Sequence, residues 1–225
     1  MYSDVSSPES PELTLELGGD LDRQLNILAT DGVFGYPAMQ SSSITVLKFQ
    51  HAEMKEVCDG IIANLRQQED FTSINLLVVA GTKNFEMENK IIGGKMPITY
   101  LRKNYRQVKS KLINSVISPL QELVQYLQTR KGRLVISSIM PSHEMVHMSS
   151  SCYRDLLDDS LTATNNLIHK LNASNGQDTL QLAEAHWTRR SRVKRYAFKR
   201  VYLRREYHMI WYKVQRRLRH LQDDA

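Results

Sequence analysis

Short apolar runs alternate along this chain with segments whose apolar residues recur every three or four positions. The runs are LNILAT, ITVLKF, INLLVVAG and RLVISSIM, at residues 25–30, 44–49, 74–81 and 133–140. Each has the length and composition of a buried strand. The helical period occupies residues 52–65, 100–128, 150–171 and 204–221. Strands separated by helices predict a parallel sheet that is covered on both faces.

This order predicts an α/β protein built as a three-layer α/β/α sandwich. DTLQLAEA, residues 178–185, is a weaker candidate for a further strand, so we expect a five-stranded parallel sheet of the flavodoxin-like type. Pro119 lies inside the long helical pattern and predicts a kink there.

Length and composition favour one domain. The 225 residues are 41% hydrophobic and 24% charged, close to globular averages. Residues 1–22 contain SSPESPE and no periodicity, which predicts a disordered acidic tail before a domain at 23–222. The sequence shows no apolar run of membrane-spanning length and no secretory signal, and its two cysteines suit a reducing compartment, so we expect an intracellular protein, cytoplasmic or nuclear.

A basic segment occupies residues 189–219. It holds 13 Lys or Arg and one acid, a balance of +12 within a chain whose net charge is +6. Aromatic residues interleave with the cations, a mixture that binds phosphates and stacks on bases. The nucleic-acid candidates are Arg189, Arg190, Arg192, Lys194 and Arg195. The other interpretation is a solvated face, or a counterpart to the acidic half of the chain.

Ligands of such folds bind where loops leave the carboxyl ends of the strands. Loops are expected there at 31–37, 49–53, 81–86, 141–147 and 196–204. In and around them stand ILATDGVFGYP, KFQHAEM, LLVVAGTKNF, VISSIMP and KRVYLRREYHMIW. By order and spacing these motifs resemble the SGNH hydrolases, the GDSL-like esterase and lipase family. The resemblance extends over roughly residues 24–221 and implies the same three-layer fold.

Five positions depart from what the resemblance implies for catalysis. Gly32 replaces the nucleophilic serine that follows the matching aspartate, and His51 replaces a glycine whose amide helps to bind the oxyanion. Lys83 replaces the asparagine of the oxyanion site. Lys199 and Tyr202 replace the aspartate and the histidine of the last motif.

These departures remove the chemistry of a serine hydrolase. Gly32 has no hydroxyl, and Tyr202, whose ordinary pKa is near 10, is a poor base at neutral pH. We therefore expect a catalytically inactive SGNH hydrolase-like domain that acts as a binding or scaffolding module. Its partner would be an anionic ligand, an acidic protein surface or nucleic acid, and no cofactor is expected. The ligand-binding candidates are Lys83, Asn84, Lys199 and Arg200.

Two enzymatic alternatives stay open. One is ester hydrolysis through a rearranged site that pairs Lys83 with His51 or His208. The other is zinc-dependent hydrolysis through SHEMVH, in which His143 and His147 would bind the metal and Glu144 would polarise a water. No third zinc ligand is evident. The sequence leaves the ligand and the oligomeric state undetermined.

Overall fold

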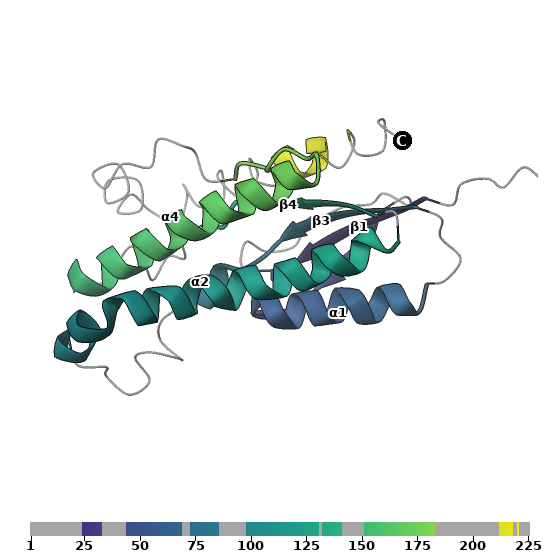
Figure 1. Cartoon of the computed structure of the whole chain (residues 1–225). Helices are drawn as coiled ribbons and strands as arrows, with labels where there is room; N and C mark the ends of the chain where they lie inside the picture. The colour runs from purple at the N-terminus through teal and green to yellow at the C-terminus, as the bar shows by residue number, and fades with distance from the viewer. Residues whose placement is uncertain are drawn as a thin grey trace, which may run out of the picture.

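The fold is built around one central sheet (Figure 1). The computed structural model describes residues 24–32, 44–68, 73–85, 98–130, 132–140, 151–182, 212–217 and 220. The predicted acidic tail at 1–22 and residues 189–211 of the basic segment lie outside these ranges.

Four parallel strands form the sheet. They are β1 (Gln24–Thr30), β2 (Thr45–Lys48), β3 (Ser73–Val79) and β4 (Gly132–Ile136), in the order β2-β1-β3-β4. Leu28 of β1 lies opposite Val46 of β2 and Leu77 of β3. This order is that of the flavodoxin-like sheets. The predicted α/β class with a parallel sheet is confirmed.

The prediction of a fifth strand is wrong for the part of the chain that the structure describes, where the sheet has four strands. Residues 178–182 reach β4 through a single parallel bridge between Ser137 and Leu180. Beside that bridge, the Asn172 side chain accepts a hydrogen bond from the Ile136 N–H at 2.9 Å and donates one to the Ile136 carbonyl at 2.8 Å. A side-chain amide thus satisfies backbone groups that another strand would have paired.

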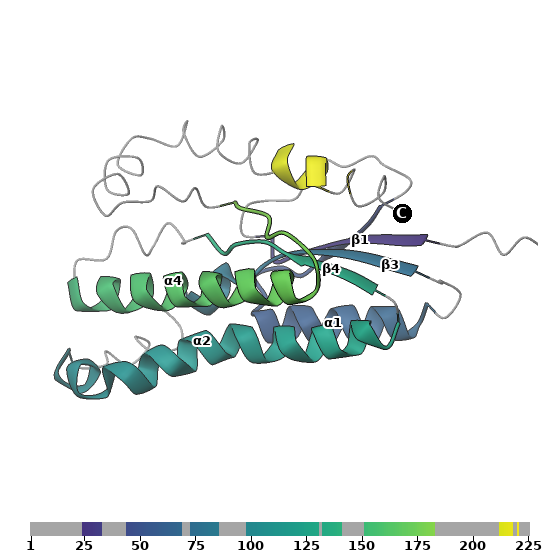
Figure 2. The same ribbon diagram turned by 45° about the horizontal axis from the view of Figure 1, so that its top comes forward.

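Three long helices cover one face of the sheet (Figure 2). They are α1 (Met54–Arg66), α2 (Ile98–Gln128) and α4 (Ser151–Ser174), which confirm the predicted helices with ends that differ by up to three residues. None of the described helices is long and apolar enough to cross a membrane. The core under this layer includes Ile27, Ala29, Leu76, Val78, Ile136, Val57, Ile61, Leu120, Leu123 and Ile168.

The opposite face of the sheet buries a second apolar cluster. Leu28, Leu77 and Val135 alternate along their strands with the residues of the first face. Leu182 and Val214 cover them, and Val214 belongs to a helical segment at 212–217, drawn in yellow in Figure 2. Both faces of the sheet therefore bury apolar residues, as expected for a chain whose strands are apolar on both sides.

Helix α2 contains Pro119, yet its one non-helical residue is Asn104, with φ −112° and ψ 19°. The Asn104 side chain donates a hydrogen bond to the Tyr100 carbonyl at 3.1 Å. We expected a kink at Pro119, but the kink of α2 lies at Asn104, nearer the start of the helix. The carbonyl that Pro119 leaves without a helical donor has another partner, described below.

Candidate functional site at the carboxyl edge of the sheet

The carboxyl ends of the strands bring four loops to one edge of the sheet. Because the strands are parallel neighbours, the residues after Thr30, Lys48, Val79 and Ile136 emerge side by side. Three of the five positions singled out by the resemblance, Gly32, His51 and Lys83, follow these strand ends.

Asp31 ties three of these loops together. Its side chain is 1% exposed. Its Oδ2 accepts a hydrogen bond from the Gly81 N–H at 2.9 Å, and its carbonyl accepts one from the His51 N–H at 3.0 Å. A buried carboxylate needs such donors, since burial of an unpaired charge is costly. Asp31 thus joins the loops that follow β1, β2 and β3.

Gly32 and His51 both have left-handed backbones, with φ +70° and +50°. Gly32 carries no side chain, and its N–H donates to the Thr30 Oγ1 at 3.2 Å. His51 is exposed and stands where the resemblance places a glycine, the residue that adopts positive φ most easily. The backbone at His51 therefore has the conformation that glycine adopts most easily.

The loop after β3 forms the short helix η1 (Thr82–Phe85). Thr82 is buried and its hydroxyl donates to the Met140 carbonyl at 3.1 Å, which joins this loop to the one after β4. Lys83 is half-buried between the buried Thr82 and Asn84. Lys83 belongs to the loop that follows β3, at the same edge of the sheet as Gly32 and His51.

Asn84, one of the ligand-binding candidates, has its side chain held inside the fold. Its Oδ1 accepts a hydrogen bond from the Met54 N–H at 2.9 Å, at the first residue of α1. Its Nδ2 donates to the Ser115 carbonyl at 3.3 Å and to the Ser115 Oγ at 3.1 Å. Both polar atoms of the Asn84 amide are thus engaged within the protein. Asn84 positions η1 against α1 and α2, and ligand binding by it stays a prediction.

Three hydroxyl groups near this edge are engaged with the backbone. Thr30 Oγ1 accepts from Gly32, Thr82 Oγ1 donates to Met140, and Ser138 Oγ accepts from the Leu182 N–H at 2.9 Å. Each of these three side chains is at least 97% buried. They hold the loops in place rather than face an open site.

The cysteines add no activated nucleophile to the described site. Cys58 lies in the core, and burial, followed by the charges of Asp59 and Glu122, raises the pKa of its thiol to about 12. Cys152 is half-buried, and both cysteines are free thiols. A thiol that stays protonated at neutral pH is a poor nucleophile.

Several sequence predictions fall outside the described ranges. These are Lys199, Arg200 and Tyr202, the cations Arg189, Arg190, Arg192, Lys194 and Arg195, and the histidines His143, His147 and His208 with Glu144. Within the described ranges, no group of three His, Cys, Asp or Glu residues is placed to hold a metal ion.

Two polar anchors were missed by the sequence predictions. Asn165 and Asn172 stand on α4, and each makes a pair of hydrogen bonds to one backbone residue at the end of β4. Asn165 binds the Ile139 N–H at 2.8 Å and the Ile139 carbonyl at 3.0 Å. The two asparagines are seven residues apart, which places them on the same face of the helix two turns apart. This spacing was the sequence signal from which a polar contact of that face could have been predicted.

Comparisons with known proteins found similarity among solved structures. No protein-family model matches the chain, and no curated protein matches it. Among solved structures, the chain is similar to a member of the lipolytic protein G-D-S-L family from Veillonella parvula DSM 2008. The TM-score is 0.47 and the sequence identity is 11%, over 86% of this chain and 97% of that chain.

Proposed function

We propose that the chain is a non-catalytic domain of the SGNH hydrolase type that acts as a binding module for an anionic ligand at the carboxyl edge of its sheet. The observation that carries this proposal is Gly32. It follows the buried Asp31 at the end of β1, in a left-handed turn, where the resemblance places the nucleophilic serine. With no hydroxyl at that position, the edge lacks the group that would attack an ester.

The surrounding groups support binding rather than covalent catalysis. Thr30, Thr82 and Ser138 already contact the backbone through their hydroxyls. Deep burial keeps these groups away from an incoming carbonyl carbon, whereas a nucleophile has to reach within about 3.5 Å of it.

The charges at this edge favour an anion. Lys83 stands in a loop at the same edge of the sheet as Gly32 and His51. Lys199 and Arg200 stand in the motif that the resemblance brings to the same edge, within the segment 189–219 whose balance is +12. Guanidinium and ammonium groups bind phosphate and carboxylate through charge-assisted hydrogen bonds.

Hydrolysis of short-chain nitrophenyl esters tests the catalytic half of the proposal. We expect the purified protein to release nitrophenol at the rate of buffer, and Gly32→Ser to remain at that rate because a serine alone lacks its base. Turnover above buffer that is lost in His51→Ala and Lys83→Met would contradict the proposal and support the rearranged ester hydrolase.

Thermal unfolding with tripolyphosphate tests the binding half. A ligand that binds the native state raises its stability by RT ln(1 + [L]/Kd), so the wild-type melting temperature should rise with tripolyphosphate concentration. Lys83→Met should reduce this rise. Lys55→Met removes an exposed lysine that is paired with Asp59 on α1 and should leave it unchanged. No rise in the wild type would refute anion binding at this edge.

A further inference from the structure

We infer that the exposed side of the first half of α2 is a binding surface for single-stranded nucleic acid. This inference rests on the proposed function, because it names the class of anion and adds a surface beside the carboxyl edge. The surface, called here the α2 basic face, consists of Arg102, Lys103, Arg106 and Lys111, all exposed.

The α2 basic face is strongly positive. Residues 98–112 contain five Lys or Arg and no Asp or Glu. Among the residues that the structure describes, no ion pair involves Arg102, Lys103, Arg106 or Lys111. A local field of this kind attracts a polyanion and releases its counterions.

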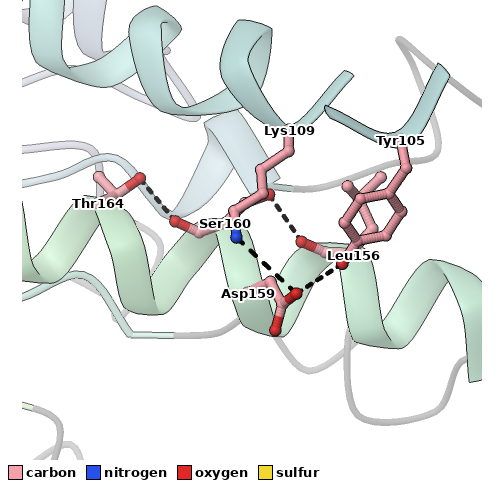
Figure 3. A network of polar contacts seen from close by, with 6 residues as sticks. All are labelled: Tyr105, Lys109, Leu156, Asp159, Ser160 and Thr164. Atoms are coloured by element: carbon pink, nitrogen blue, oxygen red, sulfur yellow. Dashed lines mark hydrogen bonds and ion pairs between the residues drawn. The ribbon is translucent and has the colours of Figure 1, made fainter. Parts of the chain in front are cut away.

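The fifth cation of this half-helix, Lys109, is set apart from the others. Figure 3 shows Lys109 and Tyr105 of α2 both directed at Asp159 of α4. The Lys109 Nζ lies 3.8 Å from the Asp159 Oδ2, and the Tyr105 hydroxyl donates to the same oxygen at 2.7 Å. The Asp159 carboxylate is thus engaged at the junction of α2 and α4.

The position of the α2 basic face places it next to the candidate site. Figures 1 and 2 show that the first halves of α2 and α4 run on past the carboxyl ends of the strands. The lengths agree, because a helix of 31 residues extends about 46 Å and a strand of seven residues about 23 Å. A chain bound to this face can therefore reach the loops that hold His51 and Lys83.

The length of helix over which these cations are spread is comparable to that of several phosphates. The cations from Arg102 to Lys111 span about 13 Å of helix, over which one strand of a duplex presents about four phosphates. Tyr100, 49% exposed, adds an aromatic ring at the start of the same helix. Aromatic rings beside cations are typical of surfaces that bind single strands, where bases stack.

A membrane surface fits less well. A helix that lies on a bilayer turns its apolar side toward the lipid. In α2 the apolar residues Leu101, Val108 and Leu112 are buried in the protein core. The exposed side offers Tyr100 as its one large hydrophobic residue among those described. Phosphate binding without insertion therefore favours nucleic acid.

The test measures binding of the full chain to a fluorescent oligothymidylate at several salt concentrations. The variant Arg102→Gln/Arg106→Gln is compared with Arg66→Gln/Lys170→Gln, which removes the same charge from exposed positions at the far ends of α1 and α4. We expect the first variant to bind more weakly and to reduce the slope of log K against log salt by about 1.4, because each phosphate contact contributes about 0.7. The control should bind like the wild type.

Two further measurements distinguish stacking from charge alone. Tyr100→Ala should weaken binding while leaving the salt slope unchanged, since it removes a ring and no charge. Polyglutamate and vesicles of anionic lipid should compete less well, per charge, than unlabelled oligothymidylate. Equal competition by either of them would overturn the choice of nucleic acid.

The outcomes separate this inference from the proposed function. Wild-type binding that both double variants retain equally would overturn the α2 basic face and move nucleic-acid binding elsewhere. Absence of wild-type binding would also overturn it, while the tripolyphosphate and ester measurements would still decide the proposed function. Circular dichroism and melting temperature verify that each variant is folded.

Discussion

Asn84 donates a hydrogen bond to the carbonyl of Ser115, across 31 positions of sequence, at 3.3 Å. That carbonyl needs a donor because Pro119, four residues later in α2, has no N–H to offer it. The same Asn84 side chain accepts from the first N–H of α1 at Met54. The Asn84 amide thus pairs two backbone groups that lack a helical partner, the first N–H of α1 and the Ser115 carbonyl of α2.

Asn84→Ala should lower the free energy of unfolding by about 2–4 kcal/mol. The substitution leaves the buried Met54 N–H without its acceptor and removes the Asn84 Nδ2 donor from the Ser115 carbonyl and hydroxyl. Each buried group left unpaired costs about 1–3 kcal/mol. Urea denaturation measures the loss.

The role of Pro119 can be isolated by a double-mutant cycle. Pro119→Ala restores a helical donor to the Ser115 carbonyl, so Asn84→Ala should cost about 1 kcal/mol less in that background. Stability changes that simply add, within about 0.5 kcal/mol, would show that Asn84 does not compensate for the proline.

Gly81→Ala should destabilise the protein by about 2–5 kcal/mol. The φ of Gly81 is +107°, and an added Cβ would lie 2.8 Å from Ile139 Cδ1 and 2.9 Å from Met54 Cε. Backbone strain and overpacking act together there. Gly176 is the matched control, because its φ is +67° and nothing lies within 4 Å of the added Cβ. Gly176→Ala should cost about 1–2 kcal/mol in the same urea experiment; equal losses for the two variants would rule out the crowding.

The buried Cys58 should make the protein less stable at alkaline pH. Its pKa is raised from 9.0 to about 12, mainly because burial disfavours the thiolate. The stabilising contribution is therefore complete below pH 9 and is lost as the pH rises toward 12, since the unfolded chain releases its proton first. Between pH 9 and 10.5 the wild type should lose about 2 kcal/mol more than Cys58→Ala. Parallel stability curves for the two proteins would contradict this expectation.

Asn172→Ala should destabilise the end of β4 by about 2–3 kcal/mol. Asn172 is fully buried, and the substitution removes its paired bonds to Ile136 and its bond to Thr179 Oγ1 at 2.9 Å. Asn175 is the control, because its half-buried side chain makes one bond, to the Leu171 carbonyl at 3.0 Å. Asn175→Ala should cost less than about 1 kcal/mol. Hydrogen exchange of the Ile136 N–H measures the local loss of stability, and it should be faster in Asn172→Ala. Unchanged protection of this N–H would refute the role of Asn172.

The sequence pattern was sufficient for the order of the elements and for most core residues. Residues such as Val57, Ile61 and Leu65 recur at the helical period, and INLLVVAG has strand character throughout. These signals are local, because burial of one helical stripe or of both strand faces leaves a mark in neighbouring residues.

The pattern was insufficient where one side chain replaced a secondary-structure element. DTLQLAEA has the composition of a strand, but Asn172 takes the Ile136 backbone groups and leaves Leu180 one bridge. Pro119 predicted a kink because a proline leaves a carbonyl unpaired, and Asn84 supplies the missing donor from another loop. Asn84 and Asn172 are both distant in sequence from the backbone groups they bind, so no local sequence pattern predicts these hydrogen bonds.

By itself the sequence determined an α/β chain with apolar parallel strands and a concentration of positive charge. The tertiary structure alone decided which polar groups meet: Asp31 with Gly81, Asn84 with Ser115 and Asn172 with Ile136. The physical reason is that apolar burial follows a repeating pattern along the chain, whereas a hydrogen bond needs two particular atoms within about 3 Å. Only the packing of helices against the sheet brings such atoms together across 31 to 50 residues.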